Sequence, residues 1–264
     1  MPLDRASESV SGPPRVTAAR VGNEARVKTR LTVIMPVYNE RDTVVDVLGR
    51  VRRSPIAKEI IIVDDGSTDG TSEMLDRLAG DDVRVIHQPR NMGKGMAIRR
   101  ALAEVSGDVV IIQDADGEYD PAEYPKLVAP IEAGEAQVVY GSRFRGSIEN
   151  MRWPNYVINR VLAWMVRVLY GVPLTDEATC YKVFRADVLK SIPLECTGFE
   201  FCPEVTAKVA KRGYRIQEVP ITYRGRSRRE GKKIGWKDGV KAIWTLLKYR
   251  LVGERSEEDR ECRT

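Results

Sequence analysis

Short apolar runs alternate along this chain with segments whose apolar residues recur at helical spacing. Runs that fit buried strands occupy residues 31–35, 59–63, 83–86 and 108–112. Helical spacing appears between them, at residues 44–51, 74–78 and 98–105. Strands that alternate with helices of this length are typical of a mostly parallel sheet with helices on its faces. The pattern therefore predicts an α/β fold.

The second half of the chain shows further elements of both kinds. Strands are expected at 137–140 and 216–223, and amphipathic helices at 155–171 and 236–251. A strongly basic run lies at 224–233, just before the last helix. We divide the chain into a disordered tail at 1–28, an α/β domain at 29–225, and a basic segment, amphipathic helix and tail at 226–264.

The charge balance argues against a nucleic-acid-binding protein. Lysine and arginine number 43 and aspartate and glutamate 38, so the net charge of +5 comes with many acidic residues. No recognition helix or RNA-binding motif is present either. The pI near 9.0 still favours an anionic partner of another kind.

Cysteine usage and hydropathy predict a cytoplasmic protein. The four cysteines lack the spacing of a zinc site, so reduced thiols are expected; they are Cys180, Cys196, Cys202 and Cys262. Residues 1–28 lack the apolar core of a signal peptide. No stretch reaches the roughly 18 unbroken apolar residues of a membrane span.

Two carboxylates follow the strand expected at 108–112. Side chains alternate along a strand, so Asp114 and Asp116 can point the same way. Two acids this close repel each other unless a cation lies between them. Mg2+ prefers oxygen ligands and commonly bridges one or two carboxylates to the phosphates of a substrate. The pair therefore predicts a metal–diphosphate site, and a plain polar turn after the strand is the alternative.

Three other loops fall at the same sheet edge, where ligands of parallel α/β sheets bind. Pro36-Val37-Tyr38-Asn39-Glu40 offers an aromatic ring and an acid to a base, or else begins a helix with Asn39 as N-cap. Asp64-Asp65-Gly66-Ser67 could accept hydrogen bonds from a nucleoside, or simply form a turn. Asn91-Met92-Gly93-Lys94-Gly95 could present backbone N–H groups to an anion. Neither a Walker A loop nor a dinucleotide-binding glycine turn is present.

The order and spacing of these four loops resemble those of family 2 glycosyltransferases. The similarity is greatest to their dolichol-phosphate or polyprenyl-phosphate mannose or glucose synthase branch. Later segments agree with it: Gly141-Ser142-Arg143, Asp176 through Arg185, Phe199-Glu200 with Pro203-Glu204, and Arg212-Gly213-Tyr214-Arg215 before Glu218-Val219-Pro220. The resemblance covers roughly residues 30–250.

This resemblance implies a GT-A fold, a GDP- or UDP-linked sugar donor, and Mg2+ or Mn2+ as cofactor. It assigns the nucleotide to residues of all four loops: Pro36, Tyr38, Glu40, Asp64, Asp65, Lys94 and Asp114. It assigns the metal to Asp114 and Asp116, with Glu118 as a third ligand at a position where the branch can carry a glutamine. Asp116 and Arg143 are then the catalytic candidates, Arg143 because its guanidinium suits a phosphate.

The implied reaction is inverting transfer of a hexose to a polyprenyl phosphate. A phosphate acceptor has a second pKa near ~6 and needs little help from a base. A soluble hydroxyl acceptor is the first alternative, with Asp176 as the candidate base. A non-catalytic basic module for nucleic acid is a remote one. His87, the only histidine, is expected to be structural or exposed.

The two amphipathic segments leave the question of membrane contact open. Helices at 155–171 and 236–251 could lie in a bilayer interface, which would place the protein at the cytoplasmic face of the membrane. They could equally pack on the sheet as core helices. The basic run at 224–233 could fold over the donor diphosphate as a lid.

Overall fold

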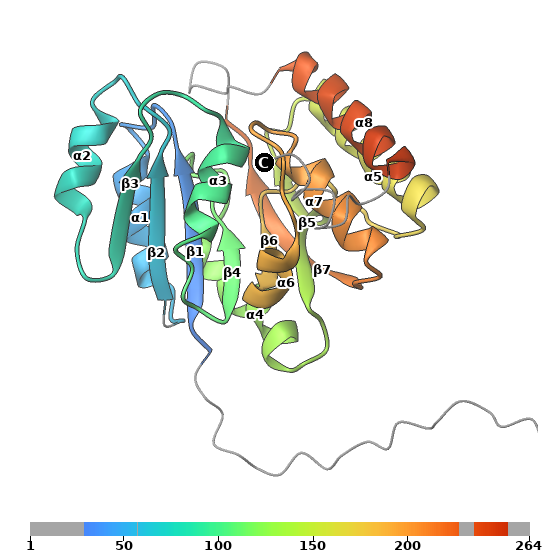
Figure 1. The fold of residues 1–264 in the computed structure, drawn as a ribbon, viewed down its shortest axis with the longest axis horizontal. Helices are drawn as coiled ribbons and strands as arrows, with labels where there is room; N and C mark the ends of the chain where they lie inside the picture. Colours follow the sequence, from blue (N-terminus) through green and yellow to red (C-terminus); the bar gives the residue numbers. More distant parts are fainter. Residues whose placement is uncertain (1–28, 57, 227–234, 253–264) are drawn as a thin grey trace, which may run out of the picture.

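One seven-stranded sheet organises the part of the chain that the computed structural model describes, residues 29–56, 58–226 and 235–252. Its strand order is β3-β2-β1-β4-β6-β5-β7 (Figure 1). The strands are β1 (Leu31–Val37), β2 (Lys58–Asp64), β3 (Val83–His87), β4 (Val109–Ile112), β5 (Val138–Glu149), β6 (Lys182–Arg185) and β7 (Ile216–Arg224). The expected α/β class with a mostly parallel sheet is confirmed.

Helices cover both faces of this sheet, with α3 in front of it and α1 behind it in Figure 1. Those of the first half are α1 (Val44–Arg53), α2 (Thr71–Leu78), α3 (Lys94–Leu102), the 3-10 turn η1 (Pro121–Glu123) and α4 (Tyr124–Glu132). Those of the second half are α5 (Trp153–Tyr170), α6 (Ala186–Ser191), α7 (Phe201–Lys211) and α8 (Trp236–Leu251).

The central strand β1 explains why the site lies where it does. It pairs in parallel with β2 on one side and β4 on the other, so that Ile34 faces both Ile61 and Ile112. Apart from the half-buried Pro36, all of its residues are buried, as a strand covered on both faces requires. Because the three strands run in parallel, the loops that follow Val37, Asp64 and Ile112 emerge at one edge of the sheet.

The sequence located most of the first half correctly but missed elements of the second. The strand expected at 137–140 is only the beginning of β5, which continues to Glu149 beside β7 after an irregularity between Ser142 and Ser147. The short β6 is antiparallel to its neighbours β4 and β5. The helices α4, α6 and α7 were also missed, although Tyr124, Leu127, Val128 and Ile131 of α4 recur at helical spacing and are buried.

The alternative that Asn39 caps the first helix is wrong. The helix α1 begins at Val44, and its N-cap position is Thr43. Asn39 has a φ of 50°, in the left-handed region, and its side-chain oxygen accepts a hydrogen bond from the Thr68 N–H at 2.8 Å. This contact joins the loop after β1 to the loop after β2, so Asn39 contributes to the edge that carries the site.

Helices α5 and α8 pack against each other beside the β5–β7 end of the sheet (Figure 1). The buried side of α8 consists of Ala242, Thr245, Leu246 and Tyr249. The large apolar residues Val240, Trp244, Leu247 and Leu251 of the same helix are exposed. Among the described helices, none is both long and apolar enough to cross a membrane. The tail at 1–28 and most of the basic run, from residue 227 on, fall outside the described residues.

Candidate active site

A lysine and an aspartate form a close ion pair at the carboxyl edge of the sheet. Lys94 is the first residue of α3, and Asp114 lies just beyond the end of β4. Lys94 Nζ is 2.5 Å from Asp114 Oδ1. Burial alone would lower the pKa of Lys94, but the charge of Asp114 outweighs it and raises that pKa above its usual value. Lys94 is therefore a fixed positive charge beside the Asp114-Ala115-Asp116 loop.

Asp116 is the acid whose charge is least well compensated at this edge. Burial, with the charges of Asp114 and Glu118, raises the pKa of Asp116 to about 7. Arg226, just after β7, acts in the opposite direction, with Nη2 at 3.3 Å from Asp116 Oδ2. An additional cation near Asp116 would stabilise its ionised form further.

Arg226 also reaches the loop after β1. Its Nη1 donates to Glu40 Oε2 at 2.9 Å, and its Nη2 donates to Glu40 Oε1 at 3.1 Å. The guanidinium thereby bridges the acids of two neighbouring strand ends, Glu40 and Asp116. The sequence placed Arg226 in a basic run with the role of a lid, and this specific pairing was missed because the partners are 186 residues apart.

Glu118 is engaged by groups that follow or belong to β7. Its Oε2 accepts from the Tyr223 hydroxyl at 2.8 Å, and its Oε1 accepts from the Arg226 N–H at 2.7 Å. In the part of the chain that the structure describes, no three acidic, histidine or cysteine side chains form a ready-made metal cage. The role of Glu118 as a third metal ligand stays a prediction.

Asp65 links the loops that follow β1, β2 and β3 at this edge of the sheet. Its Oδ1 accepts from Gln88 Nε2 at 2.8 Å and from the Met92 N–H at 2.7 Å, and its Oδ2 accepts from the Gly93 N–H at 2.8 Å. Burial raises the pKa of Asp65 above its usual value despite these bonds. The Asp65 N–H donates to the Val37 carbonyl at the end of β1. Pro36 and Tyr38, on either side of Val37, are half-buried.

Asp64 serves the turn into α2. Its carboxylate accepts from the Ser67 N–H at 3.0 Å and the Ser72 hydroxyl at 2.5 Å, and it pairs with His87 Nδ1 at 2.9 Å. Burial would raise the pKa of Asp64, but these bonds lower it below its usual value. His87 also meets Asp76 of α2 at 3.0 Å, so the expectation of a structural histidine is in keeping with its contacts.

Four N–H groups of the glycine-rich loop and the first turn of α3 are bonded within the protein, and so are not available to a bound anion, contrary to that interpretation. The N–H groups of Met92 and Gly93 donate to Asp65. Those of Gly95 and Met96 donate to the carbonyls of Gly198 and Thr197, at 3.1 Å and 3.0 Å. These glycines allow close approach of backbone, because a Cβ at Gly93 would lie 2.4 Å from the Thr197 oxygen.

Arg143 and Asp176 form a buried two-point ion pair. Arg143 Nε donates to Asp176 Oδ2 at 2.7 Å, and Nη2 donates to Oδ1 at 2.7 Å. The Arg143 guanidinium also lies 5.1 Å from the centre of the Tyr223 ring, and the Tyr223 hydroxyl contacts Glu118. The structure therefore brings these two candidates together, with each engaged mainly by the other. Lys182 is buried, and its Nζ donates to the backbone carbonyls of Glu177 and Thr179.

Comparison with known proteins places this site in a family. The model of glycosyl transferase family 2 matches residues 32–192, more than half of the chain. The chain is a family 2 glycosyltransferase. The family that the sequence resemblance implied is thereby confirmed.

Two curated relatives align with most of the transferase. An undecaprenyl-phosphate mannosyltransferase of Micrococcus luteus is 32% identical, with 84% of this chain and 99% of the relative covered. A polyprenol monophosphomannose synthase of Mycolicibacterium smegmatis is 32% identical, with 81% of this chain and 85% of the relative covered.

Solved structures confirm the GT-A fold of the transferase. Glucosyl-3-phosphoglycerate synthase from Mycobacterium tuberculosis, solved with Mn2+, UDP and phosphoglyceric acid, superimposes with a TM-score of 0.69 at 22% identity. The alignment covers 87% of this chain and 81% of that one. The same enzyme solved with Mg2+ and UDP gives a TM-score of 0.66. At this level of identity the likeness bears on the fold alone.

The buried pair yields a prediction about stability. Asp176→Asn should lower the free energy of unfolding of the transferase by about 3–5 kcal/mol, because it leaves the buried Arg143 charge without its partner. Asp187→Asn, in the exposed Arg185–Asp187 pair, is the matched control and should cost about 0–1 kcal/mol. Urea denaturation measures both. Full stability of Asp176→Asn together with lost activity would instead support Asp176 as a base.

The single histidine yields a prediction about pH. The hydrogen bond to Asp64 raises the pKa of His87, with Asp76 acting in the same direction. A raised pKa means that the protonated form stabilises the fold below the unfolded-state pKa of about 6.5, and that this contribution is lost as pH rises through the folded-state pKa. Thermal denaturation should therefore show the largest gap between the unaltered chain and His87→Gln at about pH 6. A gap that stays constant up to about pH 9 would contradict this account.

Proposed function

We propose that this transferase moves a hexose, with inversion, from a GDP- or UDP-linked sugar to a polyprenyl phosphate, using Mg2+ or Mn2+. The observation that carries the proposal is the Lys94–Asp114–Asp116 arrangement at the carboxyl edge of the sheet. The two curated relatives are an undecaprenyl-phosphate mannosyltransferase and a polyprenol monophosphomannose synthase, which supports mannose as the sugar and a polyprenyl phosphate as the acceptor.

The residues present fit a divalent cation held jointly with the donor. Carboxylate oxygens are the ligands that Mg2+ and Mn2+ prefer, and Asp116 is an acid whose ionisation is opposed by its surroundings. Mg2+ commonly takes only one or two carboxylates and completes its shell with water and substrate phosphates. Asp116 with Asp114 would therefore be the protein ligands. When bound, the ion would offset the negative charge that grows on the departing nucleoside diphosphate.

Two positively charged side chains, Lys94 and Arg226, would act on the same negative charge of the departing diphosphate. Lys94 holds Asp114 and lies at the start of α3, next to the loop that Asp65 ties to the nucleotide side. Arg226 spans Glu40 and Asp116, the acids on two neighbouring strand ends. In the proposed reaction these two side chains orient the carboxylates and add positive potential where the diphosphate binds.

The state of Asp176 favours a phosphate as the acceptor. Both of its oxygens accept from Arg143, and its side chain is fully buried. A hydroxyl acceptor needs a base within hydrogen-bond reach of its proton. A phosphate monoester is largely ionised at neutral pH, because its second pKa is about 6, and it attacks without one. A soluble hydroxyl acceptor remains the competing proposal.

The metal proposal makes a prediction about turnover. Asp116→Ala should lower transfer at least about a hundredfold, because it removes a ligand while leaving the core volume unchanged. The control is Asp108→Ala, an exposed aspartate at the opposite end of β4 that accepts from the Arg30 N–H. The assay offers GDP- and UDP-hexoses with a polyprenyl phosphate and follows sugar extracted into organic solvent.

Chelation completes that experiment. Activity of the unaltered chain should disappear with EDTA and return with Mg2+ or Mn2+. Equal turnover after exhaustive chelation would overturn the metal proposal. Transfer to water-soluble acceptors, without transfer to the polyprenyl phosphate, would favour the hydroxyl alternative.

We also propose that the paired helices α5 and α8 bind the surface of a membrane, at its cytoplasmic face. Large apolar side chains are exposed along both: Trp153, Tyr156, Val157, Val161, Trp164 and Val168 on α5, and Val240, Trp244, Leu247 and Leu251 on α8. Trp164 and Trp244 are 63% and 66% exposed. A contiguous apolar face of this kind marks an interaction site, and tryptophan suits a bilayer interface.

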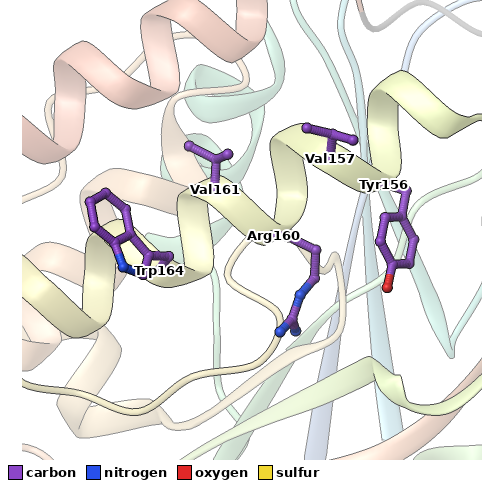
Figure 2. Close-up of a pocket in the computed structure, with 5 residues that line it drawn as sticks. All are labelled: Tyr156, Val157, Arg160, Val161 and Trp164. Carbon is purple, nitrogen blue, oxygen red and sulfur yellow. The ribbon is translucent and has the colours of Figure 1, made fainter.

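Basic residues among these apolar ones favour anionic lipid as the occupant. The α5 sequence contains arginines and no acid. Figure 2 shows Tyr156, Arg160 and Trp164 projecting from one side of α5, with Val157 and Val161 on another. These five residues line a hollow of about 270 Å³ on the outer surface of the helix. Exposed Arg160, Arg167 and Lys241 would meet the lipid phosphates while the rings and valines enter the acyl boundary.

The membrane proposal predicts vesicle binding that depends on the two tryptophans. The double variant Trp164→Ser/Trp244→Ser should lose at least about tenfold in affinity for vesicles rich in anionic lipid, because it removes two large apolar anchors. Val45→Ser, at an exposed apolar position of α1, is the control and should bind like the unaltered chain. Co-sedimentation measures the affinity. Unchanged binding by the double variant, or a dimer that it dissociates, would contradict the proposal.

A further inference from the structure

A buried glutamate outside the motif loops collects four hydrogen bonds. Glu204 of α7 accepts from the N–H of Glu195 and of Cys196, both at 2.7 Å. It also accepts from Lys208 Nζ at 2.5 Å and from the Tyr249 hydroxyl of α8 at 3.0 Å. Bonds to an ionised carboxylate are roughly twice as strong as neutral ones. Glu204 therefore fixes the start of the 195–198 segment.

The ionisation state of Glu204 follows from the same contacts. Burial alone would raise the pKa of Glu204, but the bonds from Cys196, Lys208 and Glu195 lower it below its usual value. The carboxylate is thus charged at neutral pH, which is the form that accepts all four bonds. The proposed transfer reaction gives this buried charge no direct task.

The 195–198 segment is packed directly against the first turn of α3. The carbonyls of Gly198 and Thr197 accept from the N–H groups of Gly95 and Met96. A Cβ at Gly95 would lie 2.9 Å from Cys196 Sγ and 3.0 Å from the Cys196 oxygen. Glu200 adds a second hold on the segment by accepting from the Gly198 N–H at 3.0 Å.

Lys94 lies between the two glycines that touch this segment. Its ammonium group reaches Asp114, so the position of the first turn of α3 sets where that charge lies. A displacement of the 195–198 segment would move Lys94 relative to the loop after β4. Misplacement by about 1 Å is enough to weaken a charged binding contact substantially.

We infer that Glu204 is a positioning residue for the donor: it holds the 195–198 segment against α3 and, through it, Lys94 in place for the diphosphate. This rests on the proposed function in one respect, that the donor is a nucleotide-diphosphate sugar. The carboxylate touches neither donor nor acceptor. Its hydrogen bond from Tyr249 makes α8, the helix with the exposed apolar face, part of the same support.

A double-mutant cycle in the full chain tests the inference. Glu204→Gln should weaken binding of GDP or UDP in the presence of Mn2+ by roughly tenfold, measured by calorimetry. In a Lys94→Ala background the same substitution should change binding by less than about twofold, because the residue through which it acts is gone. The value of kcat at saturating donor should change by less than about threefold, so that the loss is found in KM.

A milder variant covers the case in which Glu204→Gln fails to fold. Tyr249→Phe removes only the hydroxyl that donates to Glu204 and Glu195, and it should weaken nucleotide binding by roughly threefold. Tyr170→Phe is the matched control, since that hydroxyl donates to the Leu246 carbonyl between α5 and α8 and has no link to α3. It should leave nucleotide binding unchanged.

The outcomes separate the two proposals. An equal loss of binding from Glu204→Gln in both backgrounds, or an equal effect of Tyr249→Phe and Tyr170→Phe, would overturn the inference alone. If the unaltered chain bound neither GDP nor UDP with Mn2+, the proposed donor chemistry would fail, and the inference would fail with it.

Discussion

The crowding of acids at the carboxyl edge of the sheet is the constraint that the rest of the site accommodates. Parallel pairing of β1 with β2 and β4 brings their loops, and hence their carboxylates, to one edge. Each acid there has a different partner. Backbone N–H groups hold Asp65, hydroxyls and His87 hold Asp64, and Lys94 holds Asp114. Asp116 accepts a hydrogen bond from the Glu118 N–H at 3.0 Å and has Arg226 at 3.3 Å, and these contacts do not prevent burial and the neighbouring acids from raising its pKa to about 7.

The acids at this edge therefore fall into two groups, those held mainly by neutral groups and those held by lysine or arginine side chains. Backbone and hydroxyl groups hold Asp65 and Asp64, which thereby shape the loops after β2 and β3. Acids satisfied by Lys94 and Arg226 lie where an incoming diphosphate would compete for the same positive charges. A cation shared between Asp116 and the donor phosphates would balance both sets of charges at once, which neither Lys94 nor Arg226 can do from its fixed position.

Local patterns in the sequence were enough to find the strands and the loops that carry the acids. The buried runs of β1, β2 and β4 are nearly continuous in apolar residues, and parallel pairing then fixes which loops share an edge. The partners of those acids were harder to find, because they lie far away along the chain. Arg226 meets Glu40 across 186 residues, and no local pattern indicates such a pair.

The glycine loop before α3 shows the same limit. Its glycines could bind an anion through their N–H groups, or they could leave room for another stretch of backbone. The structure shows the second, because the 195–198 segment packs against Gly93 and Gly95. Helix α8 presents a related problem. Ala242, Leu246 and Tyr249 on one side and Trp244, Leu247 and Leu251 on the other are both apolar, so periodicity could not tell the buried face from the exposed one.

Under the proposed function, the two apolar faces of α8 have related roles, one in supporting α3 and one in binding lipid. The buried face ends in Tyr249, whose hydroxyl reaches the carboxylate that supports the start of α3. The exposed face carries Trp244 and Leu251, which suit a lipid surface. A polyprenyl acceptor has to be taken from a bilayer, and the helix that would rest on that bilayer is connected to Lys94 through Glu204 and the 195–198 segment. Lipid binding that stiffened α8 would therefore steady Lys94 as well, because Glu204 links the two through one short series of hydrogen bonds.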